Sequence, residues 1–248
     1  MWKRFKKWAR KAAQRVWHAV QKIIRVVKEV VRRTIALLDF VASLVGIRPV
    51  KYLRLQCYLC WDQKNNPVQS RAATDQLRLA AVDIFRREAN VKIIRAFNYD
   101  VVDLTNVPED FLSLNWSCSF RDSFSAPADF FRDHAENPVS TAGHESSSGA
   151  GWVADQLGYG EAISASVVRS MPSNDGCSFP VVEDFCVVEA GAGVTTLAHE
   201  LGHMCGLPHL YGHNLMDPDG ARTDTNLNRL QVSVLRTSRY VTYFRTGP

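Results

Sequence analysis

Apolar residues recur every three or four positions along the N-terminal part of the chain, from Trp2 to Leu38. This spacing is the periodicity of an amphipathic helix. Lysines and arginines fill the positions between, so the helix would carry an apolar stripe and a cationic face. Gly46 and Pro49 then supply signals that end a helix. The pattern predicts a long cationic amphipathic helix within a segment that spans residues 1–49.

Strand-like and helix-like stretches alternate after this segment. Residues 51–61 have the pattern of a strand, residues 71–90 that of an amphipathic helix and residues 91–104 that of a second strand, which together begin a βαβ unit. Prolines and a Ser-rich run indicate that residues 106–151 are mostly loop with short elements. The remaining predicted elements are strands at 161–170 and 185–190, a helical run after the turn at 191–193, and a terminal helix at 223–240. The sequence therefore predicts one α/β domain over residues 50–248.

Composition places the chain among ordinary globular proteins, but its charge is unevenly distributed. The 248 residues are 46% hydrophobic and 22% charged. Residues 1–50 hold 13 Lys and Arg against two acidic residues, a net charge of +11, whereas the rest holds 17 against 23, a net charge of −6. A basic block of this kind attracts anionic partners. No apolar run is long enough to predict a membrane-spanning helix.

The basic block allows several partners. A cationic amphipathic helix with Trp2, Trp8 and Trp17 near its start suits an anionic membrane surface, and we expect residues 1–47 to bind one. The alternatives are a helix that packs on its own domain or on a partner helix, a removable propeptide, and a nucleic-acid arm. No phosphate-binding glycine motif or aromatic–basic RNA signature occurs, so no specific nucleic-acid partner is predicted.

Six cysteines lie in the acidic part of the chain, and an even number allows up to three disulfides. This content favours an extracellular, cell-surface or membrane-associated location. Basic residues spread over the first 33 positions, and Asp39 interrupts the apolar stretch that follows, so no cleavable signal peptide is predicted. Cys57 and Cys60 could be half of a zinc or redox site, or simply buried thiols.

Three histidines have the spacing of a catalytic metal site. His199 and His203 are four residues apart in a helical run, so both imidazoles can reach one ion. His209 would point away if the helix continued. Gly206 can adopt the left-handed conformation that ends a helix, and the Leu-Pro pair after it favours an extended chain that returns His209 to the ion. Imidazole nitrogens in this arrangement favour Zn²⁺.

Three protein ligands leave a fourth coordination position for water, which distinguishes a catalytic zinc site from a structural one. Glu200, next to the first ligand, has the chemistry of a general base that accepts the proton of this water. The sequence predicts a zinc-dependent endopeptidase that acts on protein or peptide substrates. The alternatives are a metal-binding but inactive domain and a helix with ordinary histidines.

These residues resemble a known family. HELGHMCGLPH resembles the extended zinc motif of the metzincin metallopeptidases, and NLMDP at residues 214–218 resembles their Met-turn. The resemblance implies that His199, His203 and His209 are zinc ligands, that Glu200 is the general base and that Met216 forms an apolar floor below the metal. It also implies a mixed twisted sheet with an active-site helix and a C-terminal helix, an α+β arrangement that here follows the long N-terminal helix.

The chain departs from some members of the family. Metzincins of the astacin and serralysin type carry a tyrosine ligand shortly after the Met-turn methionine, where this chain has Asp217 and Pro218. The resemblance is therefore closer to matrixin-like or reprolysin-like proteins of the compact bacterial type. Tyr211 and His213 are expected to be loop residues that line the cleft. By the same resemblance, residues 161–169 would be the edge strand that binds an extended substrate, with an ordinary sheet strand as the alternative.

The disulfide pairing stays open at this point. A bond from Cys205 to Cys186 or to Cys118 would fasten the active-site helix to the sheet, and Cys177 and Cys186 could instead close a small loop. A rival hypothesis for the whole chain is a membrane-binding or interaction protein that acts through its N-terminal helix, with an inactive zinc-binding domain.

Overall fold

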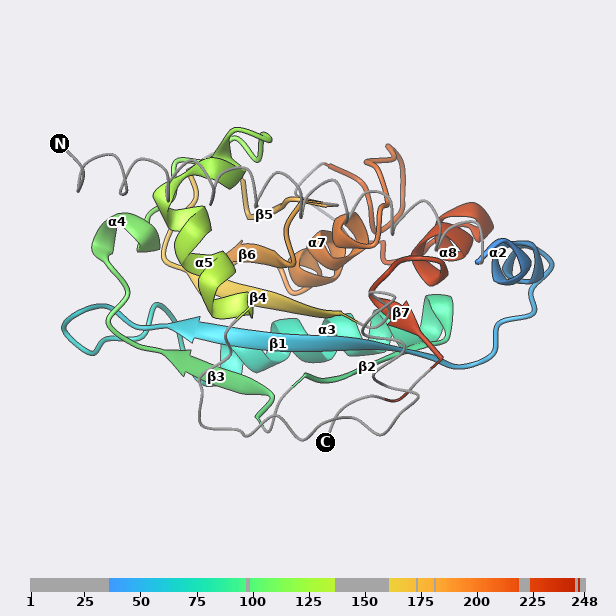
Figure 1. Ribbon diagram of the computed structural model, residues 1–248, viewed down its shortest axis with the longest axis horizontal. Helices are drawn as coiled ribbons and strands as arrows, with labels where there is room; N and C mark the ends of the chain where they lie inside the picture. Colours follow the sequence, from blue (N-terminus) through green and yellow to red (C-terminus); the bar gives the residue numbers. More distant parts are fainter. Residues whose placement is uncertain are drawn as a thin grey trace, which may run out of the picture.

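The computed structural model describes residues 36–96, 99–136, 161–172, 174–180, 182–218, 224–243 and 245. Most of the predicted N-terminal helix lies outside these residues. Its last two turns correspond to helix α2, Leu37–Leu44, which ends just before Gly46 adopts a φ of +90°. Figure 1 shows α2 at one end of the protein, beside the C-terminal helix α8.

A mostly parallel, seven-stranded sheet forms the centre of the protein. Five strands follow the order β2-β1-β4-β6-β5, and β3 and β7 each pair with β1. Strands β1, β2, β3, β4 and β6 are parallel, whereas β5 and β7 pair antiparallel with β6 and β1. The strand bounds are Lys51–Cys60 for β1, Val91–Arg95 for β2, Val101–Leu104 for β3, Ala162–Val168 for β4, Gly176–Ser178 for β5, Phe185–Glu189 for β6 and Val241–Thr242 for β7. The prediction of a mixed α/β sheet is confirmed at this level.

The long strand β1 is the axis of the sheet (Figure 1). One side of β1 pairs with β2 along its first half and with β3 along its second half. The single strand predicted at 91–104 is therefore two strands. Residues 91–95 and 101–104 pair with successive parts of β1. The predicted βαβ unit is confirmed, since helix α3, Arg71–Ala89, connects the parallel pair β1 and β2.

Six α-helices and one 3-10 turn, η1, are described around the sheet. The bounds of those not yet given are Glu109–Leu112 for α4, Asp122–Phe124 for η1, Ala126–Glu136 for α5, Thr196–Met204 for α7 and Arg229–Arg236 for α8. One hydrophobic core joins the sheet to α3, α7 and α8, and a second joins its other face to α4 and α5. Alternation along β1 divides the cores, because Leu59 belongs to the first and Cys60 to the second.

The extents of two predicted regions are defined by the structure. The region expected to be mostly loop with short elements contains α4, η1 and α5, of which α5 is an 11-residue helix that begins beside Pro127. Proline fits the first turn of a helix, where its missing N–H costs no hydrogen bond. The terminal helix predicted at 223–240 is shorter, because Asn228 and Gln231 form a capping box that starts α8 only at Arg229.

Strand β4, the central part of residues 161–169, is not an edge strand. It lies between β1 and β6 and pairs with both. All but one of its residues are buried, because β4 has a neighbouring strand on each side. The edge position on this side of the sheet belongs to β5, which is too short to be predicted from alternation.

No helix among the described residues is long and apolar enough to span a bilayer.

Candidate metal centre

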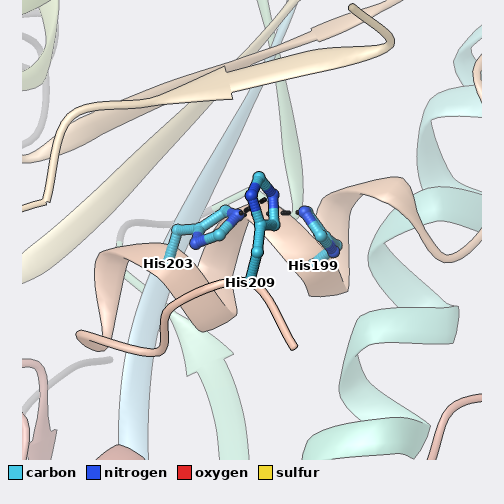
Figure 2. Close-up of side chains that lie close together, drawn as sticks. All are labelled: His199, His203 and His209. Carbon is cyan, nitrogen blue, oxygen red and sulfur yellow. Dashed lines mark hydrogen bonds between the residues drawn. The ribbon is translucent and has the colours of Figure 1, made fainter. Parts of the chain in front are cut away.

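Helix α7 positions the first two histidines on one side of its axis. His199 and His203 are one turn apart, and their Nε2 atoms lie 3.0 Å from each other. Because α7 packs against both the sheet and α3, His199 is buried, whereas His203 is partly exposed. The two imidazoles therefore converge on one point at the surface of the helix (Figure 2).

The chain turns sharply at Gly206 and brings the third histidine to the same point. Gly206 has a φ of +88°, its N–H donates to the carbonyl of His203 and the N–H of Leu207 donates to that of Gly202. This pair of bonds is a Schellman motif. His209 then returns, with its Nε2 3.0 Å from that of His203. The predicted turn is confirmed.

Two backbone carbonyl groups determine which ring nitrogen of His199 and of His203 carries a proton. Nδ1 of His199 lies 2.8 Å from the carbonyl oxygen of Leu215, and Nδ1 of His203 lies 2.8 Å from that of Leu207. A carbonyl only accepts hydrogen bonds, so Nδ1 is the donor in both rings. When the ring is neutral, this leaves Nε2 of His199 and of His203 as the unprotonated nitrogen that a metal ion can bind.

This donor set fits a metal ion. One nitrogen from each of His199, His203 and His209 lies within 4.8 Å of the others. The unprotonated nitrogen of a neutral imidazole is a metal ligand, and imidazole is a preferred ligand of zinc. The carbonyl partners of Nδ1 orient the rings as they do in known metal sites. The cluster could hold one ion, with the exposed His209 on its solvent side.

Met216 is completely buried. It packs directly against α7 at Gly202, where a Cβ would come within 2.5 Å of the Met216 sulfur. A glycine inside a helix weakens it by about 1 kcal/mol relative to alanine, and here its absent side chain makes room for the methionine. The apolar position expected for Met216 agrees with this packing.

The loop that carries Met216 is organised by Asn214. The Asn214 side chain donates to the carbonyl of Leu210 at 2.8 Å and accepts the N–H of Met216 at 2.8 Å. Gln231 of α8 donates to the same Asn214 oxygen at 3.2 Å. Leu215 lies between Asn214 and Met216 in the sequence, and its carbonyl oxygen accepts the hydrogen bond from His199. Asn214 therefore connects α8 to the group that orients the His199 ring. Sequence reasoning missed this role, although Asn214 stands in the NLMDP motif.

Glu200 follows His199 on α7, and only 4% of it is exposed. Its side chain lies against β5, since a Cβ on Gly176 would be 2.8 Å from its Cγ and 2.9 Å from its Oε1. Burial, together with the negative charge of Glu200, raises the pKa of the nearby Cys186 thiol well above its usual range. Glu200 is thus a buried carboxyl group held beside the edge strand.

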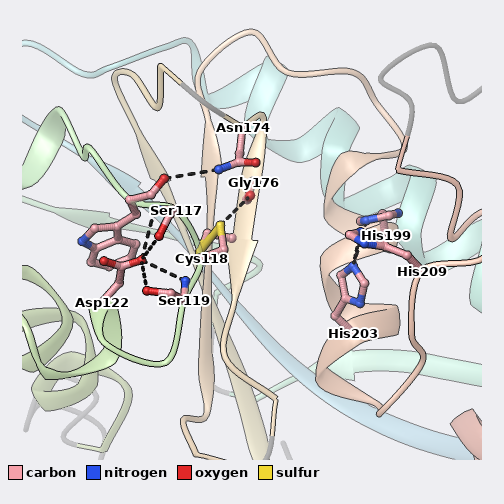
Figure 3. Close-up of a disulfide and its surroundings, with 11 residues drawn as sticks. Ser117, Cys118, Ser119, Asp122, Asn174, Gly176, His199, His203 and His209 are labelled. Atoms are coloured by element: carbon pink, nitrogen blue, oxygen red, sulfur yellow. Dashed lines mark hydrogen bonds between the residues drawn. A yellow bond between two sulfur atoms is a disulfide. The ribbon is translucent and has the colours of Figure 1, made fainter.

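One disulfide is present among the described residues, and it joins Cys118 to Cys177. The predicted bonds from Cys205 to Cys186 or Cys118, and from Cys177 to Cys186, are wrong. Cys186 and Cys205 remain buried thiols. Cys177 is in β5 next to Gly176, so its side chain points to the opposite face from Glu200. Figure 3 shows the disulfide on the side of β5 away from the histidines.

Cys57 and Cys60 do not form half of a metal or redox site. They are three residues apart on β1, which puts their side chains on opposite faces of the sheet. Cys57 belongs to one hydrophobic core and Cys60 to the other. Burial raises the pKa of both thiols to about 12. The interpretation as buried thiols is the one that fits.

Tyr211 and His213 lie in the loop between His209 and Met216, and both are exposed. His213 pairs with Asp224 at 3.1 Å. Within the described residues, the group of side chains close enough to share a metal consists of the three predicted histidines.

The chain matches no protein-family model and no curated protein sequence.

Proposed function

We propose that the protein is a zinc-dependent endopeptidase of the metzincin type, with His199, His203 and His209 as metal ligands. The observation that carries the proposal is the convergence of three imidazole nitrogens, two of them from the helix that also carries the buried Glu200. The turn at Gly206 and the packing of Met216 against Gly202 support the resemblance. A zinc ion bound there would supply a Lewis acid that polarises a carbonyl and acidifies water.

Glu200 is proposed as the general base. Its carboxyl group accepts a proton from the attacking water and returns it to the departing amine, so that peptide hydrolysis needs no covalent intermediate. Gly176 keeps the Glu200 side chain close to β5 without a steric conflict. The chemistry therefore rests on one side chain in addition to the metal ligands.

Strand β5 is proposed as the support for the substrate. It forms the edge of the sheet beyond β6, and Gly176 on it touches Glu200. An extended peptide can add to such an edge through backbone hydrogen bonds. The scissile bond would then lie next to the general base. This role passes to β5 because β4, the predicted edge strand, is paired on both sides.

The test combines metal content with proteolysis. We expect Glu200→Ala to retain one zinc per chain and to lose activity by about 10²-fold or more on a peptide library, whereas His203→Ala loses both. His213→Ala is the matched control, because His213 pairs with Asp224 outside the cluster, and it should retain zinc and activity. Full activity of purified Glu200→Ala would exclude Glu200 as the base, and an undiminished zinc content of His203→Ala would exclude the metal site.

A further inference from the structure

Helix α2 turns its polar side chains toward the protein and three of its large apolar side chains toward solvent. Ser43 is buried and the Asp39 side chain is only 9% exposed, whereas Leu37, Leu38 and Val41 are 58%, 84% and 53% exposed. At about 100° per residue, the exposed side chains share an arc of roughly 100° opposite the buried pair. This is the reverse of an ordinary surface helix, which buries its apolar side.

A buried polar cluster fixes this orientation. Asp39 accepts hydrogen bonds from Lys51 at 2.9 Å and from Arg236 at 3.2 Å. The Arg236 side chain, which is fully buried, also donates to Ser43 at 3.0 Å and to the carbonyl of Ala89 at 2.9 Å. Rotation of α2 to bury its leucines would leave the guanidinium of Arg236 without its carboxylate partner, which is costly in a protein interior. The cluster therefore holds the apolar side outward.

The exposed surface extends beyond the helix. Val45 is 69% and Ile47 is 63% exposed, and together with Leu37, Leu38 and Val41 they form what we name the α2 apolar face. Asp39, the one charged residue between positions 34 and 47, lies on the buried side of the helix. The α2 apolar face thus gathers five exposed large aliphatic side chains within residues 37–47, and such a concentration is uncommon on a protein that stays in water.

We propose that the α2 apolar face enters the interfacial layer of an anionic phospholipid bilayer. The chain immediately before it provides the complementary charge, because residues 1–33 hold 12 Lys and Arg and one acidic residue, Glu29. Such segments are attracted to anionic lipid, and an adjacent apolar surface adds binding energy as it leaves water. A second copy of the chain is a poor occupant, since two such basic segments would repel each other.

The buried cluster gives this binding a consequence for the whole protein. Asp39 and Ser43 connect α2 to α8 and β1 through Arg236 and Lys51. Residues 51–248 carry a net charge of −6 and are repelled by the same lipid. The α2 end should therefore lie against the membrane while the sheet and the histidine cluster are held away from it at a fixed orientation.

Binding to vesicles tests the proposal with the full chain. We expect sedimentation with phosphatidylcholine vesicles that contain phosphatidylglycerol, and a loss of binding of about tenfold or more in the Leu38→Gln/Val41→Asn double variant. Leu79→Gln is the matched control, because Leu79 is a 50% exposed leucine on α3, and it should bind as the wild type does. Equal binding of the double variant and the wild type would overturn the proposal, as would failure of the wild type to bind.

A spin label tests insertion directly. The Leu38→Cys variant should accept a nitroxide selectively, since the thiols of Cys57, Cys60, Cys186 and Cys205 are buried. On anionic vesicles we expect the label to gain collisions with oxygen and to lose collisions with a water-soluble nickel complex, whereas a label on Leu79→Cys shows no change. A label on Leu38→Cys that remains in water, or one that becomes shielded in a lipid-free dimer, would contradict lipid insertion.

Discussion

Two glycines at the candidate site matter for the space they leave. A Cβ on Gly202 would meet the sulfur of Met216, and a Cβ on Gly176 would meet the side chain of Glu200. Neither has the positive φ that makes glycine necessary at Gly206. Their role is instead to let a helix and an edge strand approach a functional side chain closely.

Gly176→Ala should impair catalysis without removing the metal. The added Cβ would lie 2.8 Å from Cγ of Glu200, so the carboxyl group must move, and a small displacement of a catalytic group costs about tenfold or more in rate. Zinc stoichiometry and kcat/KM measure the two effects separately. Gly193→Ala is the control, because the nearest atom to its Cβ is 3.7 Å away. If Gly176→Ala had normal activity, contact with β5 would not position Glu200.

At the scale of elements, α8 supports the loop that carries Met216 through one side chain. The capping box of Asn228 and Gln231 starts α8 and places Gln231 against Asn214. Asn214 in turn holds Leu210 and Met216. The terminal helix thus helps to shape a loop that contains no ligand itself but accepts a hydrogen bond from His199.

Asn214→Ala should weaken both the fold and the metal site. The buried N–H of Met216 and the carbonyl of Leu210 would lose their partner, at a cost to the free energy of unfolding of about 2 kcal/mol. Zinc affinity should also fall, because the carbonyl that orients His199 is less well held. Urea unfolding and competition with a zinc chelator measure these changes. Asn174→Ala removes a comparable bond, to the carbonyl of Trp116 at 3.2 Å, and should lower stability only. Unchanged zinc affinity in Asn214→Ala would show that Asn214 does not affect the orientation of the metal ligands.

The sequence predicted the elements that have strong local signals. The periodicity of α3, the strand pattern of β1 and the turn at Gly206 all follow from residue types and spacing. The short strand β5 could not be predicted, because three residues show no alternation and its pairing with β6 is set by tertiary structure. The Cys118–Cys177 bond is equally nonlocal, because its cysteines are 59 positions apart in the sequence. The histidine cluster was accessible from sequence because all its members are close along the chain.

At the scale of the whole molecule, one buried charge network joins the two ends of the described chain. Asp39 of α2 contacts Lys51 at the start of β1, Arg236 at the end of α8, and Tyr243 after β7. Burial by itself would raise the pKa of Asp39, but the hydrogen bonds from Tyr243 and Lys51 and the charges of Lys51 and Arg236 lower it below its ordinary value. Burial of Lys51 outweighs its ion pair, so its pKa is lowered too.

The attachment of α2 should depend on pH through Asp39. A carboxyl group whose pKa is lower in the folded protein contributes stability above its unfolded pKa of 3.8 and loses it as pH falls through the folded value. Wild type should therefore be more stable than Asp39→Asn near neutral pH, and the difference should shrink below about pH 4. Urea unfolding of both proteins across this range measures it, and the subtraction removes contributions from other carboxyl groups. A difference that stays constant with pH would mean that the charge of Asp39 does not hold α2 in place.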